Sequence, residues 1–207
     1  MIVIALPCAI GLMVMAGPIQ RMLFPARLNE IKEVTPLLVI LGFASFFTSI
    51  STLTTALLQS AGRMNLPIIT LVVGGAVKLI TNYILVGTEG IGIKGAPIGT
   101  LLCYLVMAAM NHYWLKKELP FKISFARYLI KPLFAGGVMG VFVYYGHKLL
   151  SVIIGDRIAT AVSIILAALV YALLLVVTKG LSESDIELLP QGKKIVRGLK
   201  KMRLLRS

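Results

Sequence analysis

The chain has 207 residues, of which 58% are apolar and only 14% are charged. A soluble domain carries about twice that charged fraction, so the composition excludes an ordinary soluble protein. The net charge of +13 is not arranged as a basic, aromatic-rich nucleic-acid surface, and no nucleic-acid partner is expected. Cys8 and Cys103 lie inside apolar runs, so neither a disulfide framework nor a metal cluster is indicated.

Six apolar segments predict an all-α polytopic membrane bundle of about six helices, at residues 2–16, 37–58, 68–87, 96–115, 131–149 and 158–178. The first segment ends at Gly17-Pro18 and begins without a basic region, so it does not resemble a signal peptide. We therefore expect that the chain begins in the middle of a helix and is the C-terminal part of a longer protein.

The distribution of Lys and Arg between alternate loops predicts the orientation. Fourteen of the 21 basic residues belong to one side and six to the other, so the side with fourteen is expected to be cytoplasmic, together with both chain ends. Residues 179–207 form a basic tail in which apolar residues recur every three or four positions. This spacing favours an amphipathic helix on anionic lipid, and a solvated tail that only enforces topology is the alternative.

Polar residues recur at helical spacing inside three of the predicted spans. The stripes are Ser45, Thr48, Thr52, Thr55 and Gln59; Thr70, Gly74, Lys78 and Asn82; and Pro97, Thr100, Tyr104, Ala108 and Asn111. Such stripes either line a common aqueous cavity or pack helix against helix, because Ser, Thr and Gly are ordinary interface residues in membranes.

Lys78 lies near the centre of its span, where a lysine costs about 2.5–3.5 kcal/mol on insertion scales. None of the six spans contains Asp or Glu. The ammonium must therefore be stabilised by water, by helix carbonyls, by an acid elsewhere in a longer protein, or by an anionic ligand. The last of these makes Lys78 a candidate binding residue.

The last two spans differ from the others. The motif Gly136-x-x-x-Gly140 permits a close helix approach, and residues 158–178 have few polar interruptions, so this pair is expected to face lipid or to hold an acyl or isoprenoid chain. No motif of a hydrolase, metalloprotease or nucleotide-binding enzyme is present, and no carboxylate pair is apparent. We therefore expect neither enzymatic activity nor a cofactor.

Several stretches resemble one family: "ALPCAIGLMVMAGPIQRMLF", "TTALLQSAGRMNLPI", "GAVKLITNYILV", "GIGIKGAPIGTLLCYLVMAAMNHYWLKK" and "LPQGKKIVRGLKK". They are similar to C-terminal regions of polysaccharide-biosynthesis flippases, in the branch of stage V sporulation protein B and close to the MurJ lipid II flippases. The most specific parts are the LQ-x-x-G-(R/K) turn at Leu58 to Arg63 and the pair Lys78 and Asn82. The larger superfamily also contains the multidrug and toxin extrusion antiporters.

The resemblance implies a fourteen-helix transporter, of which this chain supplies the last six helices. Residues 1–115 would be four helices of the C-terminal lobe, 116–178 a cytoplasmic loop and two extra helices, and 179–207 the basic tail. Such flippases are thought to move undecaprenyl-pyrophosphate-linked saccharides, such as lipid II-like precursors, across the bacterial cytoplasmic membrane by alternating access. Lys78 would then meet the pyrophosphate and Asn82 phosphate or sugar hydroxyls, with Gln59, Thr100 and Tyr104 as further substrate-binding candidates.

Two other functions remain open at this level. A cation-coupled multidrug antiporter needs carboxylates within the membrane, which these spans lack, although missing N-terminal helices would be able to supply them. A non-transporting scaffold in cell-wall or spore-coat assembly would pack its polar stripes against each other.

Overall fold

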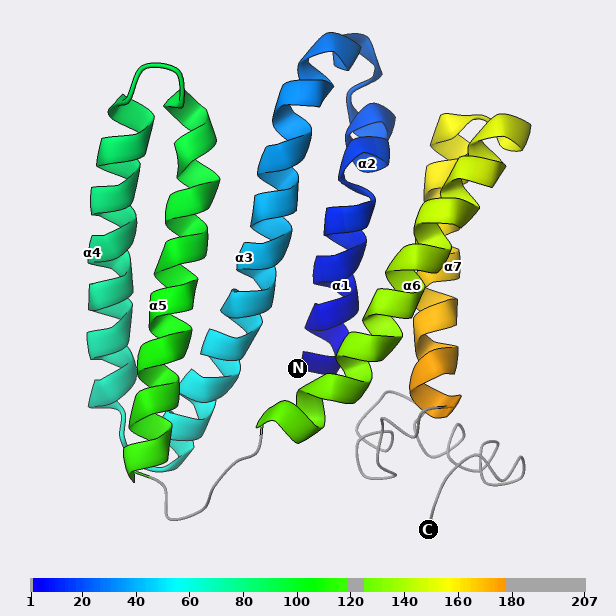
Figure 1. The fold of residues 1–207 in the computed structure, drawn as a ribbon. Helices are drawn as coiled ribbons and strands as arrows, with labels where there is room; N and C mark the ends of the chain where they lie inside the picture. Colours follow the sequence, from blue (N-terminus) through cyan, green and yellow to red (C-terminus); the bar gives the residue numbers. More distant parts are fainter. Residues whose placement is uncertain (1, 119–124, 178–207) are drawn as a thin grey trace.

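The long apolar segments fold as an all-helical bundle in the computed structural model, which describes residues 2–118 and 125–177 (Figure 1). The α-helices are α1 (Ile2–Val14), α2 (Ala16–Leu23), α3 (Leu28–Ser60), α4 (Asn65–Gly87), α5 (Gly95–Glu118), α6 (Phe125–Ile154) and α7 (Asp156–Val177). Short 3₁₀ turns precede α3 (η1, Pro25–Arg27) and α5 (η2, Gly92–Lys94). The predicted all-α membrane bundle is thus confirmed, while the predicted basic tail lies outside the described residues.

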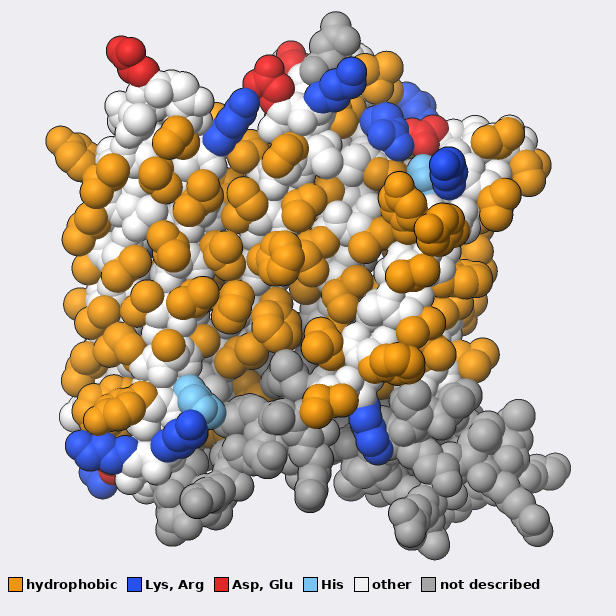
Figure 2. All heavy atoms as spheres, viewed as in Figure 1, with side chains coloured by type: hydrophobic (Ala, Val, Ile, Leu, Met, Phe, Trp, Pro, Cys, Tyr) orange, Lys and Arg blue, Asp and Glu red, His pale blue; other side chains and the backbone are white. Residues whose placement is uncertain are grey.

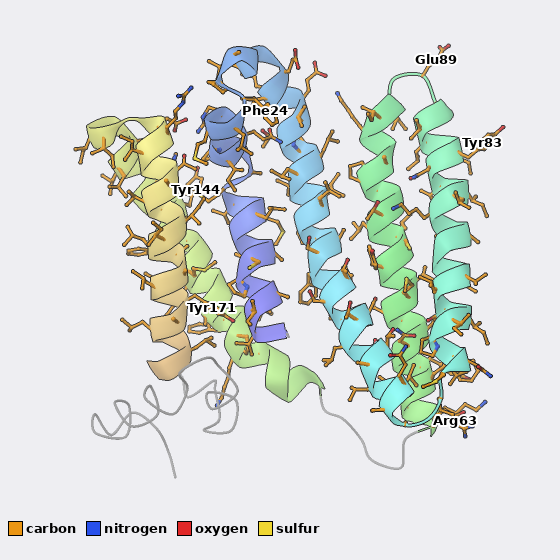
Figure 3. All side chains as sticks on the ribbon, turned by 180° about the vertical axis from the view of Figure 1, so that it is seen from behind. Phe24, Arg63, Tyr83, Glu89, Tyr144 and Tyr171 are labelled. Carbon is orange, nitrogen blue, oxygen red and sulfur yellow. The ribbon has the colours of Figure 1, made fainter. Side chains whose placement is uncertain are left out.

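Within the described residues, five helices are long and apolar enough to cross a membrane, and the bent pair α1–α2 makes a sixth if it counts as one span. Apolar side chains cover the middle of the visible face, while Lys, Arg, Asp and Glu gather at its two ends (Figure 2). Arg63 and Glu89 mark opposite ends of the α4–α5 hairpin (Figure 3). This banding is the one expected of helices that span hydrocarbon between two aqueous surfaces.

The helices extend beyond the apolar segments that predicted them. α3 begins at Leu28 rather than near residue 37, and α6 runs from Phe125 to Ile154 rather than over 131–149. Part of the predicted loop after residue 115 is therefore helical. Hydropathy marks only the portion in hydrocarbon, whereas backbone hydrogen bonds carry each helix past the membrane surface.

The LQ-x-x-G-R stretch ends α3 through two backbone hydrogen bonds and a glycine with positive φ. The backbone N–H of Gly62 donates to the carbonyl of Gln59 (3.0 Å), and that of Arg63 donates to the carbonyl of Leu58 (3.0 Å). Gly62 has φ of +78°, which glycine adopts without steric cost. These bonds form a Schellman cap, so the spacing of the motif has a local helix-ending function.

The bundle has two parts that share α3. α4 and α5 pack on each other and α5 on α3, while α6 and α7 pack on each other and meet the bent pair α1–α2 (Figure 1). The core of the second part joins Met15 of the bend to apolar side chains of α6 and α7, which are Ala135, Met139, Val143, Ala167, Tyr171 and Leu175. The α6–α7 pair thus rests on α1 and α2.

Gly136 and Gly140 let α6 approach α1 closely, as the GxxxG motif predicts. A Cβ atom on Gly136 would lie 2.5 Å from Ile10 Cδ1 and 2.8 Å from Leu6 Cδ2. One on Gly140 would lie 3.0 Å from Ile10 Cγ2. The sequence predicted a close approach at these glycines, and the structure shows that the partner is α1.

Replacing Gly136 by valine should lower the free energy of unfolding by about 1–3 kcal/mol, because the added side chain overlaps Ile10 and Leu6. Gly137→Val is the matched control, since a Cβ there has nothing within 4 Å and the residue is exposed. Thermal unfolding in detergent measures both changes. Equal shifts in the two variants would contradict the packing of α1 on this seam.

Candidate functional site

The polar stripe of α4 faces α5. Thr70 Oγ1 donates to Asn111 Oδ1 of α5 at 2.8 Å. One turn along, a Cβ on Gly74 would lie 2.5 Å from Met107 Cγ. Two further turns along, the Asn82 side chain lies directly against Gly99 of α5. The stripe is therefore the seam between α4 and α5.

Lys78 lies in the middle of this seam and is half-buried. It is thirteen residues from the start of α4 and nine from its end, or about 20 Å and 14 Å along the axis. Within residues 2–118 and 125–177 its ammonium makes no hydrogen bond or ion pair. The described acids lie at or beyond helix ends: Glu30, Glu33, Glu89, Glu118 and Asp156. The charge at mid-helix is thus not neutralised by any of these carboxylates.

Asn82 lies one turn from Lys78 and presents an unused acceptor. Its Oδ1 atom is buried and, among the described residues, accepts no hydrogen bond. A Cβ on Gly99 would collide with this oxygen, so the glycine makes room for it. A buried amide oxygen without a donor is costly in a structure.

Thr100 and Tyr104 lie on α5, each directly after a residue that contacts α4, and the Ser51 hydroxyl of α3 donates to the carbonyl of Tyr104 (3.1 Å). Thr100 follows Gly99 directly and is half-buried, and its hydroxyl donates to the carbonyl of Ala96 (3.1 Å). Tyr104 follows Cys103, whose carbonyl oxygen lies 3.3 Å from the position of a Cβ on Gly74. The structure thus places Lys78 and Asn82 on the α4–α5 seam, and Thr100 and Tyr104 on α5 next in sequence to residues of that seam.

Gln59 is separate from these four residues. It is exposed and lies within the Schellman cap at the end of α3, next to the turn that leads into α4. Lys78 is about 20 Å further along α4 from that turn. Gln59 therefore lies at one end of the bundle and Lys78 at its centre.

Asn111 is the hub of a buried network between three helices. Its Nδ2 atom lies 3.2 Å from Thr54 Oγ1, 3.0 Å from Thr55 Oγ1 and 3.4 Å from the carbonyl oxygen of Ser51. Thr70 completes the network from α4. Asn111, Thr54 and Thr70 have no exposed surface. At this level the three stripes pack against one another, as the packing alternative predicts.

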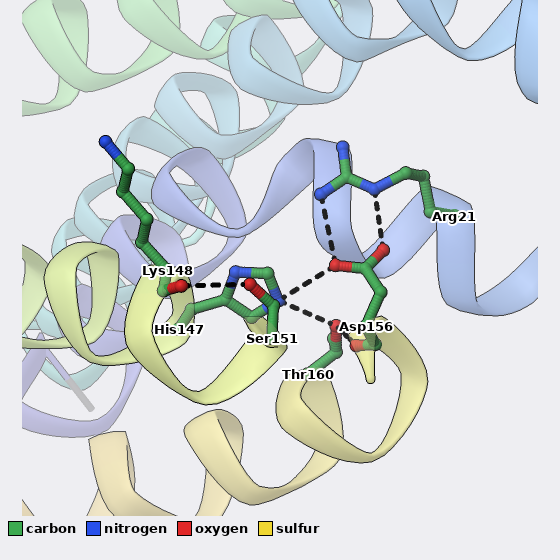
Figure 4. A network of polar contacts seen from close by, with 6 residues as sticks. All are labelled: Arg21, His147, Lys148, Ser151, Asp156 and Thr160. Atoms are coloured by element: carbon green, nitrogen blue, oxygen red, sulfur yellow. Dashed lines mark hydrogen bonds and ion pairs between the residues drawn. The ribbon is translucent and has the colours of Figure 1, made fainter. Parts of the chain in front are cut away.

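A second polar cluster, which the sequence did not reveal, joins α2 to α6 and α7 (Figure 4). Arg21 Nε donates to Asp156 Oδ2 at 2.7 Å, and His147 Nε2 lies 3.4 Å from Asp156 Oδ1 and 3.1 Å from Thr160 Oγ1. The sequence does not reveal this pairing because Arg21 and Asp156 are 135 residues apart in the chain. Only its position directly after a glycine turn hinted at a helix start.

Comparison with known proteins identifies one relative above chance. The chain is 32% identical over 108 residues to an uncharacterized membrane protein, YabM, of Bacillus subtilis (strain 168). This match covers 52% of the chain but only 19% of the relative, so the chain spans about a fifth of that protein. No family model and no solved structure matches. The chain is a multi-pass membrane protein.

The hub makes a stability prediction. Thr70→Val should lower the free energy of unfolding by about 1–2 kcal/mol, because the buried Asn111 Oδ1 then loses its donor. Thr52→Val is the matched control, since the Thr52 side chain is exposed and its hydroxyl donates only to the carbonyl of Thr48 in its own helix (2.9 Å). The control should change stability by less than about 0.5 kcal/mol. Chemical or thermal unfolding in detergent distinguishes the two, and equal effects would argue against the hub.

Proposed function

We propose that this chain is part of a membrane transporter that flips an undecaprenyl-pyrophosphate-linked saccharide across the bacterial cytoplasmic membrane by alternating access. It would serve cell-wall, spore-cortex or polysaccharide biosynthesis and would carry out no chemical reaction. In the proposed orientation both chain ends are cytoplasmic and the basic tail contacts anionic lipids. Further helices, N-terminal to this chain, would complete the transporter.

One observation carries the proposal. The half-buried Lys78 lies at mid-helix and, within the described part of the chain, has neither a hydrogen bond nor an ion pair. An unpaired cation at this depth attracts an anion more strongly than it does in bulk water, because the surrounding dielectric is low. A pyrophosphate headgroup is an anion that must pass this depth during flipping.

The neighbours of Lys78 suit the rest of such a headgroup. Asn82 has a buried amide oxygen without a donor, which a sugar hydroxyl would reach when the contact of Asn82 with Gly99 opens during transport. Thr100 and Tyr104 place hydroxyl groups on the facing helix. The Thr100 hydroxyl already donates to the carbonyl of Ala96 and can only accept, whereas the Tyr104 hydroxyl can donate and accept. Gln59, at the end of α3, would meet substrate only near the membrane surface. One cation beside neutral polar groups gives modest affinity, which a carrier needs in order to release its cargo.

The hub at Asn111 favours a second candidate, a non-transporting scaffold. In a scaffold the polar stripes serve helix packing alone, and the bonds from Asn111 to Thr54, Thr55 and Thr70 are of that kind. A cation-coupled drug antiporter receives less support. It would require a carboxylate at the depth of Lys78, whereas the acids of the described part lie at or beyond helix ends.

The test uses the complete protein in proteoliposomes that contain a fluorescent undecaprenyl-pyrophosphate saccharide. Lys78→Met should slow flipping at least about tenfold, the effect of losing one charged hydrogen bond to phosphate, and Lys78→Arg should keep most activity. Lys94→Met is the control, because Lys94 is exposed and pairs with Glu33 (3.3 Å).

Unchanged flipping in Lys78→Met would remove the lysine from the mechanism. Absence of flipping in the intact parent protein would favour the scaffold, and resistance to cationic drugs without flipping would favour the antiporter. Thermal unfolding of each variant confirms that the fold is retained.

A further inference from the structure

The bent pair α1–α2 is attached to the C-terminal helix pair at two places of different chemistry. α1 meets α6 through the apolar seam at Gly136 and Gly140. α2 meets α7 through the ion pair of Arg21 and Asp156, and Ile19 of α2 also packs against the apolar core of α6 and α7. The helix breaks between these two attachments, with an angle of 74° between α1 and α2.

The break follows from Pro18. Proline has no N–H, so the carbonyl of Val14 lacks the donor that a continuous helix would supply four residues later. Met15, at the break, is buried in the core with α6 and α7. Only a few dihedral angles therefore connect α1 to α2, and such a point serves as a hinge.

Contacts from α6 and α7 fix the position of Asp156 beside Arg21. The Thr160 hydroxyl donates to the backbone carbonyl of Asp156 (2.7 Å), so its oxygen can only accept from His147 Nε2. An ionised Asp156 carboxylate can also only accept, which makes Nε2 the protonated ring nitrogen. The imidazole thus steadies the carboxylate from α6, while Arg21 approaches from α2 with Nε at 2.7 Å and Nη2 at 3.4 Å (Figure 4).

The ion pair is open to solvent, unlike the seam. The side chains of Arg21 and Asp156 are 41% and 40% exposed, so both charges can be hydrated when they separate. Opening the exposed pair therefore costs little, and the partly buried Ile19 is the apolar contact that must separate with it. Separating α1 from α6 would open the close-packed glycine seam instead. On its other side α2 is held to α3, where Thr35 Oγ1 lies 3.1 Å from Oε1 of the buried Gln20.

We propose that the Arg21–Asp156 ion pair is a releasable latch between α2 and α7. When it opens, α2 remains on α3 and turns away from α7 about Met15, while α1 stays packed against α6. The outer end of the α6–α7 pair then separates from the rest of the bundle. The latch does not depend on which substrate is transported, so it can be tested independently of the proposed function.

The test measures two distances by pulsed electron paramagnetic resonance on the full chain in lipid nanodiscs, after replacement of Cys8 and Cys103. One spin-label pair, at Leu23 and Ile158, reports on α2 and α7, and a second, at Ile4 and Phe134, reports on α1 and α6. All four label sites are exposed. Arg21→Asp or Asp156→Arg should raise the fraction of long α2–α7 distances about fivefold, as expected for loss of one partly exposed ion pair.

The charge-swapped double variant should return this distribution toward that of the parent protein, and the α1–α6 distance should stay constant throughout. Lys94→Asp, which breaks an exposed ion pair to Glu33, should leave both distances unchanged. An α2–α7 distribution unaffected by the single charge reversals would overturn the latch. So would an equal change at α1–α6, because the ion pair would then hold the whole bundle rather than one hinge.

Discussion

Hydrocarbon offers no hydrogen bonds, so a polar group buried in this bundle must find its partner within the protein. Asn111 meets that constraint for three helices at once. One amide group accepts from Thr70 of α4 and approaches Thr54 and Thr55 of α3 within hydrogen-bonding distance. Because an amide has a fixed arrangement of donors and acceptor, these bonds also fix the rotation of each helix about its axis. The stripe of α4 is thereby turned toward α5.

The second part of the bundle is held by a different means. Between α1 and α6 there is a glycine seam in which dispersion contacts replace hydrogen bonds, and polar bonds occur at its margins. Tyr171 of α7 donates to the carbonyl of Val3 (2.7 Å), and Arg21 meets Asp156 at the opposite end. Small residues set the distance between these helices, and the polar contacts at the ends set their alignment.

The sequence predicted the helices far better than their contacts. Apolar runs located every span, because hydrocarbon thickness imposes the same length on each. The GxxxG motif predicted a close approach at Gly136 without indicating which helix would fill it. The pair of Arg21 and Asp156 was beyond reach, because no spacing rule links residues on different helices. The bend at Met15 was missed for another reason, since Gly17-Pro18 was taken as the end of a span rather than as a break within it.

In the candidate site, too, the sequence indicated which residues are unusual but not which residues they contact. Lys78 was identifiable because one charge in an apolar span is conspicuous, and Asn82 because it lies four residues further on. The surroundings of these residues could be learned only from the structure. It shows that Gly99 contacts the amide of Asn82, and that Gln59 lies in a helix cap at the end of the bundle. Of the hydroxyl groups around Asn111, those of Thr55 and Thr70 belonged to the predicted stripes and that of Thr54 did not. Sequence alone had no means to separate Thr55 and Thr70 from the residues near Lys78.

That separation rests on how completely each polar group is satisfied. Around Asn111 the donors and acceptors are matched within the protein, so a ligand there would have to break existing bonds. Around Lys78, within the described structure, the polar groups are not matched by partners in the protein. The ammonium and the Asn82 oxygen lie one helical turn apart, a donor and an acceptor that do not bond to each other. Asn82 is directed at Gly99, and its oxygen is therefore not the partner of the lysine. Matched polar groups hold a membrane bundle together, whereas the unpaired cation at Lys78 is the group that the proposed function assigns to an anionic ligand.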